Sequence, residues 1–441
     1  GGAETGMVGA AFVGVDVVYI RLNLLLERGV VGQGHLDGYA GLLGLNVYDV
    51  GDEWRAAVVL VDVAHELGQA LFAVERLHFN DALYTIVYDC GNDAKNSSGS
   101  RVKDKIELAF KKDEKVDALY ISHYDSDHVN GVVHLLNHCQ VKHVFLPMLN
   151  PGQELWFNID YSTNDLIYRI YYHQEDTFQQ DNMRFNIHKV NIFNQNEDEQ
   201  ITTNTESFDN LIGNINSGVG VRLAGNGDEP DWVYVTHNIN SWDTNIWDGF
   251  IQLLGLPSGS TPQDLVTKWK AKDVTCSELK KIFIGANRAA GVKVSKESEF
   301  INEHSMTLYS GPIDNNLASS NYNLDLSTHC YNSHKKATDC ECIIGLCGAG
   351  CLYLGDYNAK KNVQLLKNCY FRIWHNIGLI QIPHHGSKNN FSSDIIIKGG
   401  LHIIPIERRS GQVNPTFVED EIKNQREFVK LVDHDLEIRI F

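Results

Sequence analysis

Short apolar runs rich in β-branched and aromatic residues alternate along the chain with stretches that carry apolar residues at helical spacing. Residues 84–91 are such a run and end in Asp-Cys-Gly, which predicts a strand that closes in a tight turn. Apolar positions recur among charges over residues 102–112, which predicts an amphipathic helix. Residues 118–122 then predict a short buried strand.

Similar patterns continue toward the end of the chain. Further strands are predicted at 61–74, 141–147, 306–310, 351–354, 377–382 and 402–406, and further helices at 131–138, 247–254 and 260–283. Strands that alternate with helices predict an α/β fold class.

The composition changes along the 441 residues, and this change indicates the domain organisation. Residues 1 to about 75 contain no Lys, Ser, Pro or Cys. We expect an N-terminal segment of unknown role at 1–61, followed by one large domain at 62–441. Within that domain, a polar stretch followed by helical patterns predicts an inserted, partly helical region at about 195–300.

Charge and cysteine content restrict the function classes. The formal net charge of −18 disfavours broad, non-specific binding to long DNA, although a metal ion can reverse the charge locally. Nine cysteines in so long a chain are too few for a disulfide scaffold and fit a reducing compartment. The apolar stretch at 7–26 is interrupted by Asp16 and Arg21, which is atypical of a signal peptide or membrane span. We therefore expect a cytoplasmic protein without a membrane partner.

The candidate chemistry lies where predicted strands end. The segment His123-Tyr124-Asp125-Ser126-Asp127-His128 follows one strand and places four ligand-type side chains in six residues. Imidazole and carboxylate groups together suit Zn, Mn or Fe. Two further strands end in Gly355-Asp356 and in Pro383-His384-His385-Gly386-Ser387. Each of these two motifs alone is weaker evidence for a metal site than the segment His123 to His128. Because strand ends can converge at one edge of a sheet, the three motifs together predict one site.

This order of motifs resembles the metallo-β-lactamase superfamily, and it is most similar to the branch that contains the hydrolase domain of the ComEC-type competence proteins. Three further segments are similar to that superfamily: Leu67-Gly68-Gln69, Asp89-Cys90-Gly91 and Glu303-His304-Ser305-Met306-Thr307-Leu308. The resemblance covers about residues 62–150 and 300–441. It implies an αββα sandwich with metal ions at one edge.

The resemblance also implies a ligand set. His123 and Asp125 would bind a first divalent ion, Asp127 and His128 a second, and Asp356 would bridge the two. His385 is the expected last ligand, with His384 as the alternative. The residues expected to take part in catalysis are Asp127, His384 and Lys388. Lys388 would contact a substrate phosphate, although it is equally compatible with a solvated loop cation.

Two departures from the superfamily pattern affect the first ion. Asp125 stands where the commonest motif has His, which shifts the preference toward Mn or Mg without excluding Zn. The superfamily often supplies a further His to this ion, and the sequence offers only His188, whose position on an alternating strand is more typical of a structural residue.

A second, separate cluster joins Cys330, Cys340, Cys342, Cys347 and Cys351, with His329 and His334 interleaved. Such a cluster could hold a structural zinc ion. The alternative is a set of free thiols around a buried strand, because free Cys is commonly buried.

These residues predict a metal-dependent hydrolase with two divalent ions, Zn or Mn, that would lower the pKa of a bridging water toward neutrality. We expect a phosphodiesterase or nuclease that acts on a nucleotide or a short nucleic acid. Two alternatives remain open: hydrolysis of an amide, lactone or thioester, and a non-catalytic metal-binding sensor module of the same fold. The sequence does not fix the oligomeric state.

Overall fold

The computed structural model describes most of the chain after residue 58. The described ranges are 59–63, 72–79, 82–91, 100–161, 165–172, 185–193, 205–223, 232–239, 244–271, 275–289, 305–313, 322–327, 344–346, 348–405, 416–432 and 437–440. The chain divides into two units, and all of these residues belong to the unit formed by 57–338 and 342–441. Residues 1–58 of the predicted N-terminal segment lie outside the described residues.

The first sheet has six strands in the order of the sequence, β1-β2-β3-β4-β5-β6. Its strands are β1 (Val59–Val63), β2 (Ala73–Phe79), β3 (Ala82–Tyr88), β4 (Lys115–Tyr120), β5 (Gln140–Pro147) and β6 (Asn186–Val190). β1, β2 and β3 pair antiparallel, whereas β3 to β6 pair parallel. The carboxyl ends of β3, β4 and β5 therefore meet at one edge of this sheet.

The second sheet has eight strands in the order β16-β15-β14-β13-β10-β9-β8-β7. Its strands are β7 (Thr205–Ser207), β8 (Gly220–Leu223), β9 (Trp232–His237), β10 (Thr307–Pro312), β13 (Gly350–Tyr353), β14 (Ile377–Gln381), β15 (Leu401–Pro405) and β16 (Phe428–Val432). β13 to β16 are parallel, so the turns that follow β13 and β14 also lie at one edge. A small third sheet joins β12 (Ile344–Leu346), β11 (Tyr322–Ser327) and β17 (Glu437–Ile440).

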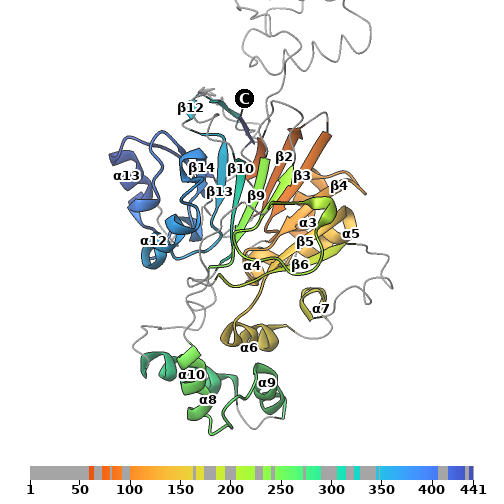
Figure 1. Ribbon diagram of the computed structural model, residues 1–441, viewed down its shortest axis with the longest axis vertical. Coiled ribbons are helices and arrows are strands. Elements are labelled where there is room, and N and C mark those ends of the chain that lie inside the picture. Colours follow the sequence, from red (N-terminus) through yellow and green to blue (C-terminus); the bar gives the residue numbers. More distant parts are fainter. Residues whose placement is uncertain are drawn as a thin grey trace, which may run out of the picture. The chain divides into compact units, whose positions relative to one another are not determined.

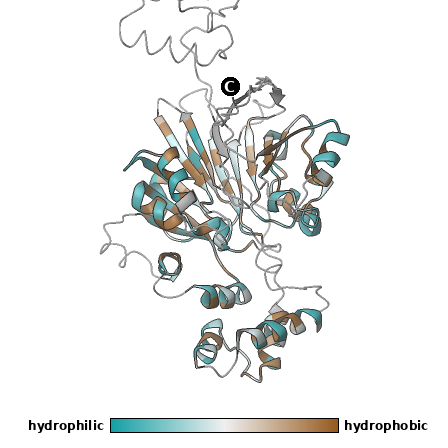
Figure 2. Cartoon of the chain, turned by 180° about the vertical axis from the view of Figure 1, so that it is seen from behind, coloured by the Kyte–Doolittle hydropathy of each residue, from teal (hydrophilic) through white to brown (hydrophobic). Residues whose placement is uncertain are grey.

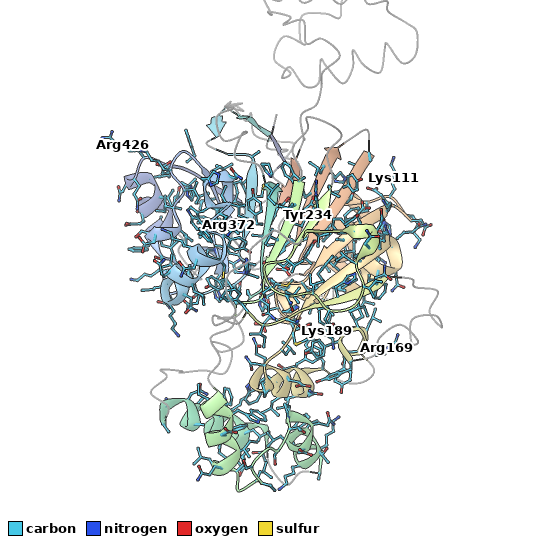
Figure 3. The ribbon with its side chains drawn as sticks, in the orientation of Figure 1. Lys111, Arg169, Lys189, Tyr234, Arg372 and Arg426 are labelled. Carbon is cyan, nitrogen blue, oxygen red and sulfur yellow. The ribbon has the colours of Figure 1, made fainter. Side chains whose placement is uncertain are left out.

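The inner faces of the two large sheets share one core. Tyr120 of β4 stacks on Tyr234 of β9, with 6.2 Å between ring centroids, and Figure 3 labels Tyr234. Leu77 of the first sheet and Leu379 of the second lie in the same buried cluster. Alternate side chains of each strand thus pack between the sheets, as in a β-sandwich.

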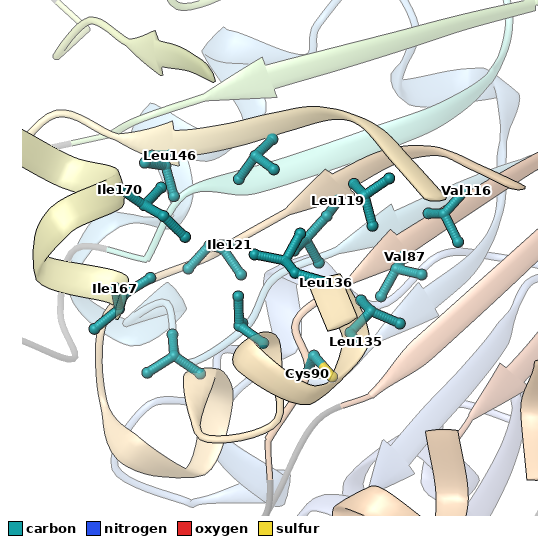
Figure 4. Packing of buried hydrophobic residues seen from close by; sticks show 14 of the residues in the cluster. Val87, Cys90, Val116, Leu119, Ile121, Leu135, Leu136, Leu146, Ile167 and Ile170 are labelled. Atoms are coloured by element: carbon teal, nitrogen blue, oxygen red, sulfur yellow. The ribbon is translucent and has the colours of Figure 1, made fainter. Parts of the chain in front are cut away.

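Helices cover the outer face of each sheet (Figure 1). The first sheet is covered by α3 (Ser100–Ala109), α4 (Ser126–Val129), α5 (Val132–His138), α6 (Pro151–Asp160) and α7 (Leu166–Tyr172). In Figure 4, Leu135 and Leu136 of α5 face Leu119 of β4. The second sheet is covered by α12 (Ala359–Cys369) and α13 (Thr416–Asn424), and Figure 2 shows that the helices carry both hydrophilic and hydrophobic residues. These mixed α/β layers are consistent with the predicted αββα sandwich.

The predicted insertion at about 195–300 contains two kinds of structure. Helices α8 (Thr244–Leu253), α9 (Pro262–Lys270) and α10 (Cys276–Ala289) pack with α6 around the buried Trp156, outside both sheets. Strands β7, β8 and β9 lie in the same interval but are part of the eight-stranded sheet. β7 and β8 were not predicted because they have three and four residues and lie in polar sequence. β9 is a six-residue, largely apolar run that the prediction included in the insertion.

The helix predicted over 260–283 is two helices in the structure. Thr261 caps α9 through a reciprocal pair of hydrogen bonds with Asp264. Thr275 exchanges the same pair of hydrogen bonds with Glu278 at the start of α10. Each capping box starts a new helix within one apolar pattern. Among the described residues, no helix is long and apolar enough to cross a membrane.

Candidate metal centre

Three strand ends deliver the predicted ligands to one place. The loop after β4 carries His123 and continues into α4, which carries Asp127 and His128. The turn after β13 carries Asp356, and the turn after β14 is a short 3-10 segment, η6 (His384–Gly386). Both sheets therefore contribute side chains to this centre at the carboxyl ends of their parallel strands.

The carboxylate of Asp356 lies between two groups of ligand-type side chains. Its Oδ1 lies 3.5 Å from Nε2 of His128 and 4.0 Å from Nε2 of His385. Its Oδ2 lies 4.0 Å from Nε2 of His123 and 3.0 Å from Nδ1 of His384. Because each oxygen faces a different set of imidazoles, Asp356 occupies the position that a bridging carboxylate would take.

Two sets of ligand atoms each lie within 4.8 Å of one another: His123 with His128 and Asp356, and Asp127 with His128 and His385. The second set contains the three residues expected to bind the second ion. Asp125 lies beside the first set, with Oδ2 3.9 Å from Nε2 of His123. His128 belongs to both sets, so the two groups of ligand atoms share one imidazole.

The buried imidazoles fit a cation. Nε2 of His123, His128 and His385 is buried in each case and has no hydrogen-bond partner within the described part of the chain. Buried polar atoms without partners are unfavourable unless a ligand or ion satisfies them. Three such nitrogens that converge near carboxylates are the donor set expected of a divalent metal site.

Asp89 orients the imidazole of His128 through a contact with its Nδ1 atom. Its Oδ2 lies 2.7 Å from Nδ1 of His128 and accepts a hydrogen bond of 2.7 Å from the Ser122 hydroxyl. The backbone N–H of Ser122 donates to Oδ1 of the same carboxylate, again at 2.7 Å. A proton on Nδ1 of His128 is therefore held by Asp89, which leaves the Nε2 lone pair directed into the centre.

Two serine hydroxyls orient His123 in the same way. Ser122 Oγ lies 2.8 Å and Ser305 Oγ 3.2 Å from Nδ1 of His123. Because the Ser122 hydroxyl donates its hydrogen bond to Asp89, its oxygen can accept a hydrogen bond from Nδ1–H of His123. Ser305 also accepts a 3.0 Å hydrogen bond from the backbone N–H of Asp356. Ser305 lies within a segment similar to the superfamily, yet its sequence position alone indicates no role for it.

Two glycines allow the segments of the centre to approach one another. A Cβ atom on Gly91 would lie 2.2 Å from the carbonyl oxygen of Asp127. Gly355 has φ +53°, and a Cβ atom there would lie 2.8 Å from Cβ of Ser122. Gln381 fixes the same turn, because its Oε1 accepts hydrogen bonds from the N–H groups of Leu354 and Gly355. Glycine at position 355, the first residue of the Gly-Asp motif, therefore suits both the positive φ of this turn and its close approach to Ser122.

The two histidines of η6 adopt left-handed backbone conformations, with φ 49° at His384 and 54° at His385. Such conformations are strained in residues other than glycine and are concentrated at functional sites. The side chain of His385 is 8% exposed and reaches the ligand set of Asp127. The side chain of His384 is 33% exposed and contacts Asp356 instead. His385 thus belongs to one of the two ligand sets, whereas His384 approaches Asp356 alone.

The electrostatics of the centre also favour a cation. Burial, together with the neighbouring Asp127 and Asp356, raises the pKa of Asp125 to about 7. Burial lowers the pKa of His123 well below its usual value, which keeps the imidazole neutral and able to bind a metal. Burial opposes protonation of His128, yet Asp89, Asp127 and Asp356 raise its pKa well above the usual value. A metal ion would replace that proton and relieve the repulsion between the carboxylates.

The two remaining candidates, Lys388 and His188, make other contacts. Lys388 is exposed, and its Nζ lies 5.4 Å from the ring centroid of Phe417. His188 is buried, with Nε2 2.9 Å from Nδ1 of His143 and Nδ1 2.9 Å from the carbonyl oxygen of Gly213. Both ring nitrogens of His188 are therefore engaged in contacts within the fold, which fits the structural alternative.

Several predicted segments lie outside the described residues. They are Leu67-Gly68-Gln69, Glu303-His304 and most of the cysteine cluster, namely His329, Cys330, His334, Cys340, Cys342 and Cys347. Cys351 is described and is a buried free cysteine of β13. The possible structural zinc at this cluster stays a prediction.

The fold and the centre define a mixed α/β protein with two mixed sheets and buried His/Asp groups suited to metal ions. Residues 81–148 match the sequence model of the metallo-beta-lactamase superfamily, and the two mixed sheets are consistent with the fold of that superfamily. The match includes β3, β4, β5 and the segment His123 to His128, and it ends before Asp356 and His385. No curated protein matches the chain. Most members of this superfamily are metal-dependent hydrolases.

Proposed function

We propose that this protein is a hydrolase with two divalent metal ions, Zn or Mn, and that it cleaves a phosphodiester bond in a nucleotide or a short nucleic acid. The observation that carries the proposal is the position of Asp356, whose two oxygens face different imidazoles. A single-ion site needs no carboxylate in such a position. Divalent ions bound here would lower the pKa of a water molecule and stabilise negative charge on the reacting group.

The residues of the chain take distinct roles in this proposal. His123 and Asp125 would hold the first ion, Asp127, His128 and His385 would hold the second, and Asp356 would contact both. The side chain of Asp127 is 30% exposed, so it can also accept a hydrogen bond from the attacking water. His384 would donate a hydrogen bond from its imidazole to a substrate oxygen, which its 33% exposed side chain supports.

Two arguments support a small phosphodiester as the substrate. The order of the motifs resembles the ComEC-type branch, and Lys388 lies three residues beyond His385, where its ammonium group could contact a phosphate. The net charge of −18 disfavours long duplex DNA on electrostatic grounds. The proposal therefore has three further parts: the protein belongs to that branch, the bond is a phosphodiester, and the location is cytoplasmic.

The test is a hydrolysis screen of the full chain with Zn²⁺ or Mn²⁺. Bis-p-nitrophenyl phosphate, cyclic nucleotides and short single-stranded oligonucleotides are the phosphodiester probes. We expect activity in the wild type and a loss of about a hundredfold or more in Asp127→Ala and Asp356→Ala. Asp394→Ala, which removes an exposed carboxylate from the segment Ser393–Ile395, should keep wild-type activity.

Each alternative predicts a different outcome. Activity on amide, lactone or thioester probes, with none on any phosphodiester, would show that the bond class is wrong and the metal chemistry right. Metal binding without turnover of any probe would indicate a sensor module. Less than half an equivalent of metal per chain, unchanged in Asp127→Ala, would contradict the metal centre itself; about two equivalents are expected at this centre, apart from any ion bound elsewhere on the chain.

A further inference from the structure

A second group of possible metal ligands lies on the helices that cover the first sheet. Glu107 belongs to α3, whereas His134 and His138 belong to α5, and one ligand atom from each lies within 4.8 Å of the others. None of the three belongs to the two ligand sets around Asp356. We propose that Glu107, His134 and His138 form a zinc site that joins α3 to α5.

The spacing on α5 favours chelation of one ion. His134 and His138 are four residues apart, so their side chains lie on the same face of the helix, one turn from each other. Their ring centroids are 5.7 Å apart. Pairs of histidines with this spacing are a recognised arrangement of zinc ligands on a helix.

The surroundings orient both imidazoles. Nε2 of His138 lies 3.0 Å from the carbonyl oxygen of Phe110, which follows the end of α3. A proton held at Nε2 leaves the lone pair on Nδ1 of His138 available to a metal. Nε2 of His134 is a buried atom with no hydrogen bond among the described residues, and it lies 3.3 Å from Oε1 of Glu107.

The donor set selects zinc over the harder divalent ions. Two imidazole nitrogens and one carboxylate oxygen suit Zn²⁺, whereas Mg²⁺ and Ca²⁺ prefer oxygen ligands alone. A water molecule would complete a tetrahedral site, because a surface depression lined in part by Glu107, Phe110 and His138 gives solvent access. Lys103, whose Nζ lies 3.8 Å from Oε1 of Glu107, is the competing cation that zinc would displace.

Such a site would act on stability rather than on the reaction. α5 begins three residues after Val129, the last residue of the short helix that carries Asp127 and His128. A zinc ion shared by α3 and α5 would link two helices on the same outer face of the first sheet. It would bind the folded chain more tightly than the unfolded chain and therefore raise the thermal midpoint of unfolding.

The test counts zinc bound by the full-length protein after equilibrium dialysis against buffered Zn²⁺. We expect the double variant His134→Gln, His138→Gln to hold one zinc ion per chain fewer than the wild type. His375→Gln removes an exposed histidine from another element, Trp374–Asn376, and should match the wild type. Because only the difference between variants is used, ions at other sites do not affect the conclusion.

Two more measurements guard against a folding artefact. Glu107→Gln changes an exposed side chain and should weaken zinc binding while the circular dichroism spectrum stays that of the wild type. Zinc should also shift the imidazole ¹⁵N resonances of His134 and His138 in the wild type, and Mg²⁺ should not. A double variant that binds as many zinc ions as the wild type, or zinc that leaves both sets of resonances unmoved, would overturn the proposal.

Discussion

Oδ2 of Asp89 lies 2.7 Å from Nδ1 of His128, although the two residues are 39 positions apart in the chain. This short hydrogen bond joins the turn after β3 to the helix after β4, together with the backbone hydrogen bond from the N–H of Cys90 to the carbonyl oxygen of His128. The contact requires Gly91, because a side chain there would collide with the backbone of Asp127. The Asp-Cys-Gly turn is thus a support for a predicted metal ligand and not only the end of a strand.

Asp89→Asn should weaken metal binding by about 10- to 100-fold, because an amide holds the His128 imidazole less firmly and makes it a poorer donor. The measurement is a zinc titration in competition with a chromophoric chelator. Asp117→Asn is the matched control, since Asp117 is also buried but bonds to Thr85 and Lys115 away from the centre. Wild-type zinc affinity in Asp89→Asn would show that Asp89 does not support the site.

Ser305→Ala should also weaken metal binding. The substitution removes the acceptor of the Asp356 N–H and one of the two hydroxyls beside Nδ1 of His123. Loss of these buried hydrogen bonds should also lower the free energy of unfolding by about 1–3 kcal/mol. The measurements are denaturant unfolding and the same zinc competition.

Ser310→Ala separates the two effects of Ser305→Ala. Ser310 is likewise buried, and its hydroxyl donates to Glu75 between the sheets, far along β10 from the centre. It should cost similar stability and leave zinc affinity unchanged. Equal zinc affinities in both serine variants would assign Ser305 a purely structural role.

Gly355→Ala should destabilise the fold more than a glycine substitution in open space. Gly355 and Gly255 both have positive φ, at 53° and 65°, so alanine is strained at either position. Only at Gly355 would the added Cβ collide, at 2.8 Å from Cβ of Ser122, whereas nothing lies within 4 Å at Gly255. We expect a loss of about 1 kcal/mol for Gly255→Ala and clearly more for Gly355→Ala, measured by denaturant unfolding. Equal losses would mean that the turn after β13 relaxes without disturbing Ser122.

The sequence identified the candidate ligands better than it identified their supports. His123, Asp356 and His385 were recognisable because metal-type side chains stood in short motifs at the ends of predicted strands. Ser305 acts on His123 across 182 residues, a relationship that only the pairing of two sheets creates. The sequence indicates only a turn at Asp89, because aspartate and serine at strand ends are also ordinary turn residues.

The strands also differ in how far the sequence alone predicts them. β3, β4 and β5 were predicted because each ends in an apolar run, which is typical of buried parallel strands. β7 has three residues and β8 has four. Both strands lie within the polar stretch that was interpreted as part of an insertion. Their place in the eight-stranded sheet depends on partners that come from elsewhere in the chain.

Glu75 is a buried acid in the core between the sheets. It accepts hydrogen bonds from Ser310 at 2.6 Å and from Tyr234 at 3.1 Å. Burial raises its pKa from 4.5 to about 7, and these hydrogen bonds offset only part of that effect. The folded protein therefore keeps a proton on Glu75 at pH 6, whereas the unfolded chain releases it.

The sign of the pH dependence follows from that difference. Between pH 4.5 and about 7 the folded state binds more protons at Glu75 than the unfolded state, so the stability contributed at this residue falls as pH rises and stays low above pH 7. The full loss is on the order of 3 kcal/mol. Glu75→Gln cannot ionise, so its free energy of unfolding should rise relative to the wild type as pH increases from 5 to 8, as measured by urea denaturation. Asp420→Asn on the exposed side of α13 should run parallel to the wild type. A constant difference between Glu75→Gln and the wild type across this range would mean that Glu75 is ionised in the folded protein at pH 5, with the core or its hydrogen bonds stabilising the charge.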